Sequence, residues 1–463
     1  MHPKRWRRST HLAVGAAVLV AVVAVVAAAL VFVGDRPTEA LAAARPAPAA
    51  ASPGVVPVPE DSEIPTEVGM SAALAAALAD PNLGVLTGRI SDALTGELLW
   101  RQADDLPMQP ASTNKVLTAA AALLTLERDA TVTTKVVAAS DRGAADSRGV
   151  VVLVGGGDTT LSAAPADQQT WYKGAARISD LAAQVRASGY TPMAVQVDTS
   201  LYSGPGLAPG WDPADIDGGD IAPIEPVMLD GGRTQPTTFD SRRSPTPALD
   251  AGRALAVALG VDPATVTVVP GPPTGRELAS VESAPLMERL RQMMVNSDNV
   301  MAESIGREVA AESQRPLSFA GAAGAVSARL AGEGIDMTGA KLLDSSGLSV
   351  DNRLTAITLD EVIGEAAGPD HRELRPLLDL LAVAGGSGTL SDRFLQAGTT
   401  RPAAGWLRAK TGSLTGTNAL AGIVTDRSGR VLTFAFLSNN AGPTGRLAID
   451  ALAATLRSCG CVR

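Results

Sequence analysis

Histidine is scarce in this chain, which has only three among its 463 residues. His2 and His11 flank a basic N-terminal tail, so His371 alone remains for the rest of the chain. A metal site built on several histidines is therefore not expected. His371 lies in the polar stretch 368–372, which is typical of a loop before a helix. We expect it to be exposed to solvent rather than to act as the base of a Ser-His-Asp triad.

Cysteine, aromatic residues and clustered positive charge are also in short supply. Cys459 and Cys461 are the only cysteines, and they could form a Cys-x-Cys disulfide, bind a metal weakly or stay free. An exposed tail without a catalytic role is the simplest interpretation. Aromatic residues make up 3% of the chain, and the net charge is −9. No basic patch with interleaved aromatic residues is present, so a nucleic-acid partner is not expected. We also expect no cofactor.

The N-terminus contains one long hydrophobic run, from residue 12 to residue 34, which follows the basic tail of residues 1–11. Its 23 residues suffice to cross a bilayer, which takes about 20, and exceed the roughly 7–15 residues of a signal-peptide core. The positive flank predicts a cytoplasmic N-terminus, with everything after the run outside. We favour an uncleaved anchor, although Ala40-Leu41-Ala42 leaves cleavage and secretion as the alternative.

A serine and a lysine three residues apart precede an alanine- and leucine-rich run. Ser112-Thr113-Asn114-Lys115 leads into residues 116–126, which read as a buried helix. Residues three apart share a helical face, so the hydroxyl of Ser112 should face the amine of Lys115. Burial lowers the pKa of a lysine, which would let the amine take a proton from the serine near neutral pH. Alone, this spacing is a weak signal.

Two further motifs strengthen it. Ser297-Asp298-Asn299 follows an amphipathic run, and Lys410-Thr411-Gly412 precedes an expected strand. The ordered set S-x-x-K, S-D-N and K-T-G is the signature of penicillin-binding proteins and class A β-lactamases. Asp298 could be only a solvated loop residue, and Asn299 only a turn residue.

With these motifs the chain resembles the D-alanyl-D-alanine carboxypeptidase/endopeptidase family, the type-4 class C penicillin-binding proteins (serine peptidase family S13). Four further stretches between residues 69 and 440 match the family, namely Gly156–Leu161, Asp344–Ser349, Asn352–Thr355 and Gly388–Leu390. The resemblance implies an α+β fold: a β-lactamase/DD-peptidase-like catalytic domain, with an antiparallel sheet flanked by helices, that is interrupted by an inserted smaller α/β domain.

Composition and resemblance together predict six segments. They are a cytoplasmic basic tail (1–11), a transmembrane anchor or signal segment (12–34), an Ala/Pro-rich linker (35–68), the N-terminal portion of the catalytic domain (69–130), the inserted domain (131–280) and the C-terminal portion of the catalytic domain (281–463). Within the insert we expect a long loop without clear structure between residues 204 and 232.

The resemblance also implies roles. Ser112 would attack the carbonyl of the penultimate D-alanine, with Lys115 as the proton acceptor, and Ser297 would relay a proton to the leaving D-alanine. Lys410 would supply positive charge. The implied substrate-binding residues are Asn299, Thr411, Gly412 and Ser413, with the backbone N–H groups of Ser112 and Ser413 as the oxyanion hole.

The implied partners are peptidoglycan stem peptides and β-lactams, with the membrane reached through the N-terminal segment. Two other hypotheses use the same motifs: a serine β-lactamase or esterase, and a catalytically silent wall-binding or β-lactam-sensing protein. The sequence leaves carboxypeptidase and endopeptidase activity open.

Overall fold

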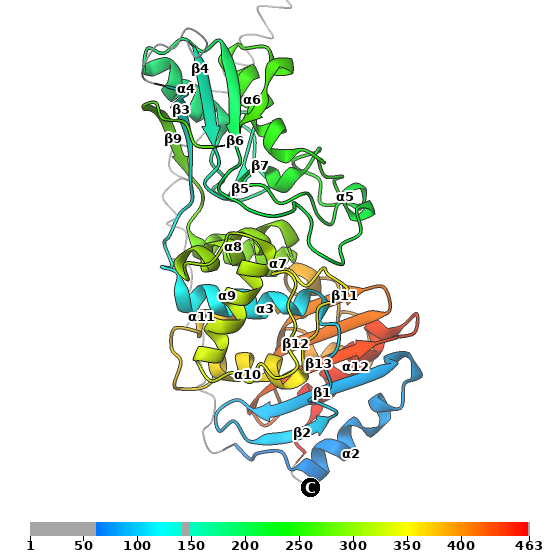
Figure 1. Ribbon diagram of the computed structural model, residues 1–463. Coiled ribbons are helices and arrows are strands. Elements are labelled where there is room, and N and C mark those ends of the chain that lie inside the picture. Colours follow the sequence, from blue (N-terminus) through cyan, green and yellow to red (C-terminus); the bar gives the residue numbers. More distant parts are fainter. Residues whose placement is uncertain (1–61, 141–148, 270, 462–463) are drawn as a thin grey trace, which may run out of the picture. The chain divides into compact units, whose positions relative to one another are not determined.

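The computed structural model describes residues 62–140, 149–269 and 271–461 (Figure 1). The basic tail, the apolar run and the linker up to residue 61, including the predicted membrane anchor, lie outside these ranges. Within the described ranges, no helix has the length and apolar character needed to cross a membrane.

A six-stranded antiparallel sheet forms the centre of the catalytic domain, in the order β10-β11-β12-β13-β1-β2. Its strands are β1 (Val85–Asp92), β2 (Leu98–Gln102), β10 (Ala382–Val383), β11 (Leu407–Leu414), β12 (Thr417–Thr425) and β13 (Val431–Asn439). The first strand pairs with the last along its whole length, from Val85 opposite Asn439 to Asp92 opposite Leu432. The sequence predicts two hairpins, one from residues 84–91 and 97–101 and one from residues 419–425 and 430–438. They are confirmed as β1–β2 and β12–β13.

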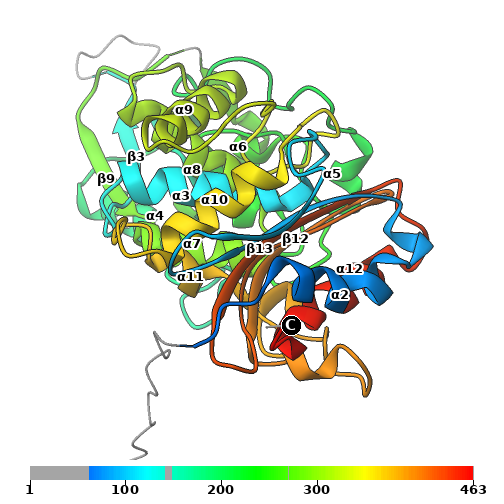
Figure 2. The same cartoon turned by 90° about the horizontal axis from the view of Figure 1, so that it is seen from below.

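Side chains on the two faces of this sheet belong to different hydrophobic cores, because successive residues of a strand point to opposite faces. Leu420 and Phe436 pack with α2 (Glu67–Leu78) and α12 (Gly445–Ser458), whereas their neighbours Ala419 and Leu437 face the other helices. Figure 2 shows α2 and α12 together on one side of the sheet and α3, α8 and α10 on the other. The helices of that second layer are α3 (Lys115–Thr125), α7 (Leu286–Asn296), α8 (Asn299–Glu312), α9 (Phe319–Gly332), α10 (Ala356–Ala367) and α11 (Pro376–Leu380).

A second, mixed sheet lies between the first and second motifs, in the order β8-β6-β4-β3-β9. Its strands are β3 (Thr133–Ala138), β4 (Val150–Val154), β6 (Ala194–Asp198), β8 (Thr267–Val269) and β9 (Glu277–Glu282). Valines from β3, β4 and β6 form a separate core with α4 (Ile178–Ala187) and α6 (Pro247–Leu259). The predicted boundary at residue 280 falls within β9, whose pairing with β3 extends to Glu282.

The expectation of an unstructured loop over residues 204–232 is partly wrong. This stretch contains α5 (Ala214–Gly218) and β7 (Val227–Leu229), and β7 pairs in parallel with β5 (Asp158–Leu161). A three-residue strand carries too little periodicity to be predicted from sequence. The short 3₁₀ helices of the described chain are η1 (Pro81–Leu83), η2 (Ala111–Asn114), η4 (Asp230–Gly232), η5 (Pro263–Thr265), η6 (Gly388–Leu390) and η7 (Arg401–Ala403).

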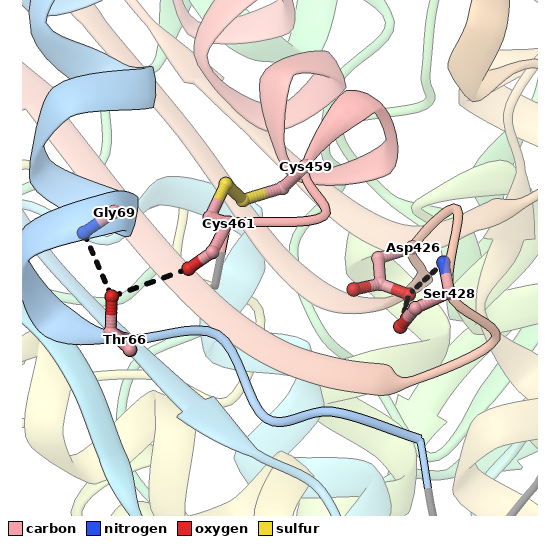
Figure 3. Close-up of a disulfide and its surroundings, with 6 residues drawn as sticks. All are labelled: Thr66, Gly69, Asp426, Ser428, Cys459 and Cys461. Atoms are coloured by element: carbon pink, nitrogen blue, oxygen red, sulfur yellow. Dashed lines mark hydrogen bonds between the residues drawn. A yellow bond between two sulfur atoms is a disulfide. The ribbon is translucent and has the colours of Figure 1, made fainter. Parts of the chain in front are cut away.

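The two cysteines form a disulfide at the end of α12 (Figure 3). Cys459 is buried, with 3% of its surface exposed, so the interpretation as an exposed tail is wrong for this residue. The carbonyl of Cys461 accepts a hydrogen bond from the backbone N–H of Thr66 at 2.8 Å. The Thr66 hydroxyl in turn caps α2 by accepting from the N–H of Gly69 at 3.1 Å. The end of the described chain is thus bonded to its beginning.

Candidate active site

Ser112 lies in η2, the 3₁₀ turn immediately before α3, rather than in the α-helix itself. Strand β11 passes close beside this turn at Gly412. A Cβ atom there would lie 2.6 Å from the Pro110 carbonyl oxygen and 3.1 Å from the Cβ of Ala111. Only glycine allows this approach, which explains why the third residue of K-T-G lacks a side chain.

Lys115 begins α3, and its side chain is completely buried. Its ammonium donates hydrogen bonds to Ser112 Oγ at 2.9 Å, to Asn299 Oδ1 at 2.6 Å and to the Ser346 carbonyl at 2.7 Å. The predicted pairing of hydroxyl and amine is confirmed. Burial lowers the pKa of Lys115 from 10.5 to about 8, and the nearby charges of Asp344, Glu303 and Asp298 oppose that shift.

Ser297 and Lys410 form a second hydroxyl–amine pair. Ser297 follows α7 as its C-cap and has the left-handed conformation, with φ 56° and ψ 37°. Its Oγ accepts a hydrogen bond from Lys410 Nζ at 2.9 Å. Lys410 is also completely buried; burial, followed by the positive charges of Lys115 and Arg393, keeps its pKa well below the usual lysine value.

The strand expected after K-T-G is present as β12, and the motif itself also lies in a strand. Lys410, Thr411 and Gly412 lie inside β11, which begins at Leu407. Glycine inside a run of mixed polarity reads as a strand end, but here it marks the close approach to η2 described above.

Asp298 is not a solvated loop residue. It is 5% exposed and caps α8, accepting from the N–H of Met301 at 3.0 Å. Its other oxygen accepts from the hydroxyl of Tyr172 at 2.7 Å, and Arg233 lies 3.5 Å from it. Burial would raise the pKa of this carboxyl, but the positive charge of Arg233 and that of Arg243 hold it below its usual value.

Asn299 begins α8 and points its two amide atoms in different directions. While Oδ1 accepts from Lys115, Nδ2 donates to the carbonyl of Asp220, in the insert, at 3.0 Å. This residue is therefore more than a turn residue, because it connects the buried lysine to the inserted segment.

A cavity of about 660 Å³ opens at this point. The predicted residues Ser112, Ser297, Asn299, Thr411 and Ser413 line it. Lys115 and Lys410 lie buried behind the serines. Further lining side chains, which carry charge, a hydroxyl or apolar surface, are Asp215, Asp220, Phe239, Leu348, Thr389, Leu414, Thr415, Arg393 and Arg446.

His371 takes no part in this arrangement. Its side chain is half-buried rather than fully exposed, and its neighbours are Glu333, Glu365 and Glu373, at 3.3–3.7 Å. In the described ranges, no group of three or more His, Cys, Asp or Glu residues is placed to hold a metal ion.

The sequence motifs did not identify several residues at the site. Thr389, which accepts from Thr411 Oγ1 at 2.8 Å, and Ser346 both lie in stretches that match the family. Tyr172 and Arg233 lie in the insert, where no pattern indicates a contact with Asp298. Only a three-dimensional structure could identify them.

Comparison with known proteins decides the family. Residues 70–243 and 237–456 match the D-Ala-D-Ala carboxypeptidase 3 (S13) family. The chain belongs to this family. Residues 1–57 match a separate family, the Carboxypeptidase Rv3627c-like N-terminal domain.

Similar proteins include "Carboxypeptidase DacB" of Mycolicibacterium smegmatis, 69% identical over the full length of both chains. "Carboxypeptidase Rv3627c" of Mycobacterium tuberculosis is 63% identical, also over both full lengths. The "D-alanyl-D-alanine carboxypeptidase" of Actinomadura is 29% identical over 82% of this chain and 83% of its own. The resemblance predicted from the motifs is confirmed, and the protein is a serine-type D-Ala-D-Ala carboxypeptidase.

Penicillin-binding protein 4 of Haemophilus influenzae is a solved structure with the same fold. It superimposes with a TM-score of 0.67 over 85% of this chain and 98% of its own, at 22% identity. The predicted α+β fold class is confirmed.

Proposed function

We propose that Ser112 is the nucleophile and Lys115 the base of a serine DD-peptidase that cleaves the terminal D-Ala-D-Ala bond of peptidoglycan stem peptides. One observation carries the proposal. The Lys115 amine lies 2.9 Å from the Ser112 hydroxyl in a fully buried position, where its pKa falls to about 8. A lysine in this state is partly neutral near physiological pH and can accept the hydroxyl proton.

In the acylation step, Ser112 Oγ bonds to the carbonyl carbon of the penultimate D-alanine, and its proton passes to Lys115. The developing oxyanion is held by the backbone N–H groups of Ser112 and Ser413, each worth about 3 kcal/mol in such a role. The C–N bond then breaks, and the leaving amine of D-alanine takes a proton from Ser297. Lys410, bonded to Ser297 at 2.9 Å, stabilises the hydroxyl oxygen while it gives up that proton. Ser297 regains a proton from Lys115, so that the Lys115 amine is neutral again before deacylation.

In the deacylation step, water attacks the ester carbonyl and its proton passes to Lys115. The ester bond breaks, and Ser112 regains its proton. The same amine therefore accepts the proton in both steps. Asn299, whose side chain lines the cavity, binds the substrate backbone.

The terminal carboxylate of the substrate binds at the end of the cavity formed by β11. Thr411 and Ser413 line this end, and the charge of Lys410 lies behind them. Gly412 keeps the strand close to the nucleophile. A D-alanyl cross-link presents the same carbonyl to Ser112, so the proposal includes endopeptidase activity.

β-Lactams should acylate the same serine. One structure of the Haemophilus protein, with a TM-score of 0.60, is a complex with a novel β-lactam. We also propose that the catalytic domain works outside the cytoplasmic membrane, tethered by the apolar run of residues 12–34, and that the segment from about residue 131 to the end of β9 is the inserted domain.

The test is covalent labelling of the full chain by a fluorescent penicillin, together with mass spectrometry of muropeptides before and after incubation. We expect labelling of the wild type, none of S112A, and loss of one D-alanine from pentapeptides. Labelling that persists in S112A would overturn the assignment of the nucleophile.

A further inference from the structure

Helix α8 directs two side chains toward the buried lysine. Asn299 and Glu303 are four residues apart and so share one face of the helix. Asn299 accepts a hydrogen bond from Lys115 directly. Glu303 is completely buried, and its Oε1 accepts from two successive backbone N–H groups, those of Ser345 at 3.0 Å and Ser346 at 2.8 Å.

The segment that Glu303 holds is itself a ligand of the lysine. The carbonyl of Ser346 accepts a hydrogen bond from Lys115 Nζ at 2.7 Å. The carboxylate binds the N–H group of the same residue, and so holds in place the residue whose carbonyl contacts the amine. The N–H group of the adjoining peptide, that of Gly347, is bonded to Asp344 at 2.7 Å. Glu303 and Lys115 are therefore connected through one residue of backbone.

Glu303 is held in place from the other side as well. Its second oxygen lies 3.5 Å from the guanidinium of Arg307, and has no hydrogen-bond partner among the residues that the structure describes. Arg307 packs against the rings of Tyr202 and Phe319, at 5.0 and 4.2 Å from their centroids. Such a partner keeps the carboxylate from turning away from the loop.

The charge of Glu303 also reaches the lysine. Glu303 is one of three acidic groups whose charge raises the pKa of Lys115, the others being Asp344 and Asp298. Lys410 is the positively charged group near Lys115, and the charge of Lys115 lowers the pKa of Lys410. Burial and the charge of Asp344 raise the pKa of Glu303 itself to about 7, so this carboxyl ionises below the pKa of about 8 of Lys115.

We propose that Glu303 is a positioning residue for Lys115: its carboxylate sets the Ser346 carbonyl against the amine, and its negative charge determines how readily that amine gives up its proton. The inference rests on the proposed role of Lys115 as the base. Glu303 is too deeply buried to touch a substrate.

The test compares E303Q with E308Q in the full chain, using the rate of penicillin acylation as a function of pH. Glu308 is a matched control, because it lies on the same helix and is largely buried, but pairs with Arg289 and is not among the charges that act on Lys115. E303Q removes the negative charge that favours the ammonium form. In E303Q we expect the acid limb of the pH–rate profile, where the acylation rate rises with pH, to move to lower pH by about half a unit or more. We expect the acid limb of E308Q to stay at the wild-type position.

A third variant, E303D, keeps the charge but shortens the side chain. We expect its acid limb to stay near the wild-type position while its maximal rate falls, because the Ser346 carbonyl is no longer held. If E303Q fails to fold, E303D still tests the inference, since an unchanged maximal rate would overturn it. Acid limbs of E303Q and the wild type that coincide would also overturn it. Acylation that survives K115A would instead contradict the proposed function, so the two failures are distinguishable.

Discussion

The hydroxyl of Tyr172 donates a hydrogen bond of 2.7 Å to the carboxylate of Asp298, the central residue of the S-D-N motif. Tyr172 belongs to the segment between the first two motifs, and Arg233 of the same segment donates to the tyrosine oxygen at 2.9 Å. Asp298 caps the helix that presents Asn299 to the buried lysine. The inserted segment therefore helps to hold the S-D-N motif and, through Asn299, the lysine that we propose as the base.

Substitution of Tyr172 by phenylalanine should weaken both the fold and the chemistry. Asp298 would lose one of its buried donors, which typically costs about 1–3 kcal/mol. We expect a lower melting temperature and slower penicillin acylation. Y190F is the matched control, because Tyr190 is also in the insert but donates to the carbonyl of Val150, at 3.2 Å. If Y172F is acylated by penicillin at the wild-type rate, the insert does not help to hold the S-D-N motif.

Acylation should depend on pH through Lys115. Its pKa is lowered to about 8, and only the neutral amine can accept the proton of Ser112. The neutral fraction falls about tenfold for each pH unit below that value, so we expect the acylation rate to rise from pH 6 to pH 8 and then to level off. Stopped-flow measurements with a chromogenic β-lactam would check this. A rate independent of pH over this range would exclude Lys115 as the base.

The penicilloyl-enzyme should be long-lived. Class A β-lactamases use a glutamate to activate the deacylating water, and Glu225 is the one glutamate between Lys115 and Ser297 that the sequence places in a plausible loop. In the structure its carboxylate instead accepts from the N–H of Ala248, at the start of α6, at 2.7 Å. We expect a lifetime of minutes or longer by mass spectrometry, an equal lifetime in E225Q, and release of D-alanine from a D-Ala-D-Ala peptide. Rapid turnover of penicillin without D-alanine release would favour a β-lactamase.

Loss of the disulfide should destabilise the chain without affecting the active site. Serine at both Cys459 and Cys461 removes a short cross-link, worth about 1–2 kcal/mol by loop entropy, and loosens the carbonyl that Thr66 binds. We expect a lower denaturation midpoint and unchanged penicillin acylation. Reduced wild-type protein should behave like the double variant. A tenfold loss of acylation would show that the C-terminus is coupled to the site.

The sequence predicted the features of the site that depend on local geometry. Ser112 and Lys115 meet because they are three residues apart, in the turn η2 and at the first residue of α3. The order of the three motifs identified Ser297 and Lys410. The two hairpins of the sheet followed from alternating polarity and a turn.

The remaining features depend on contacts between distant segments. Tyr172 lies 126 residues before its partner, and no periodicity indicates such a pair. Glu303 is an acidic residue on an expected helix, which usually means a solvated face, yet it is completely buried because the 345–346 backbone satisfies it. The sequence also did not assign Lys410 to a strand, because the close approach of η2 rather than local composition explains the glycine at position 412.

The pairing of β1 with β13 places Val85 opposite Asn439, so one of the first strands to be synthesised finds its main partner only near the C-terminus. Closing so long a loop costs chain entropy, and this cost is offset only when the contacts between the two strands form, so the pairing is slow. An emerging chain contains Ser112 early, but the strand that carries Lys410 arrives some three hundred residues later. The protein should therefore be unable to react with cell-wall peptides until both β11 and β13 have been synthesised and have joined the sheet.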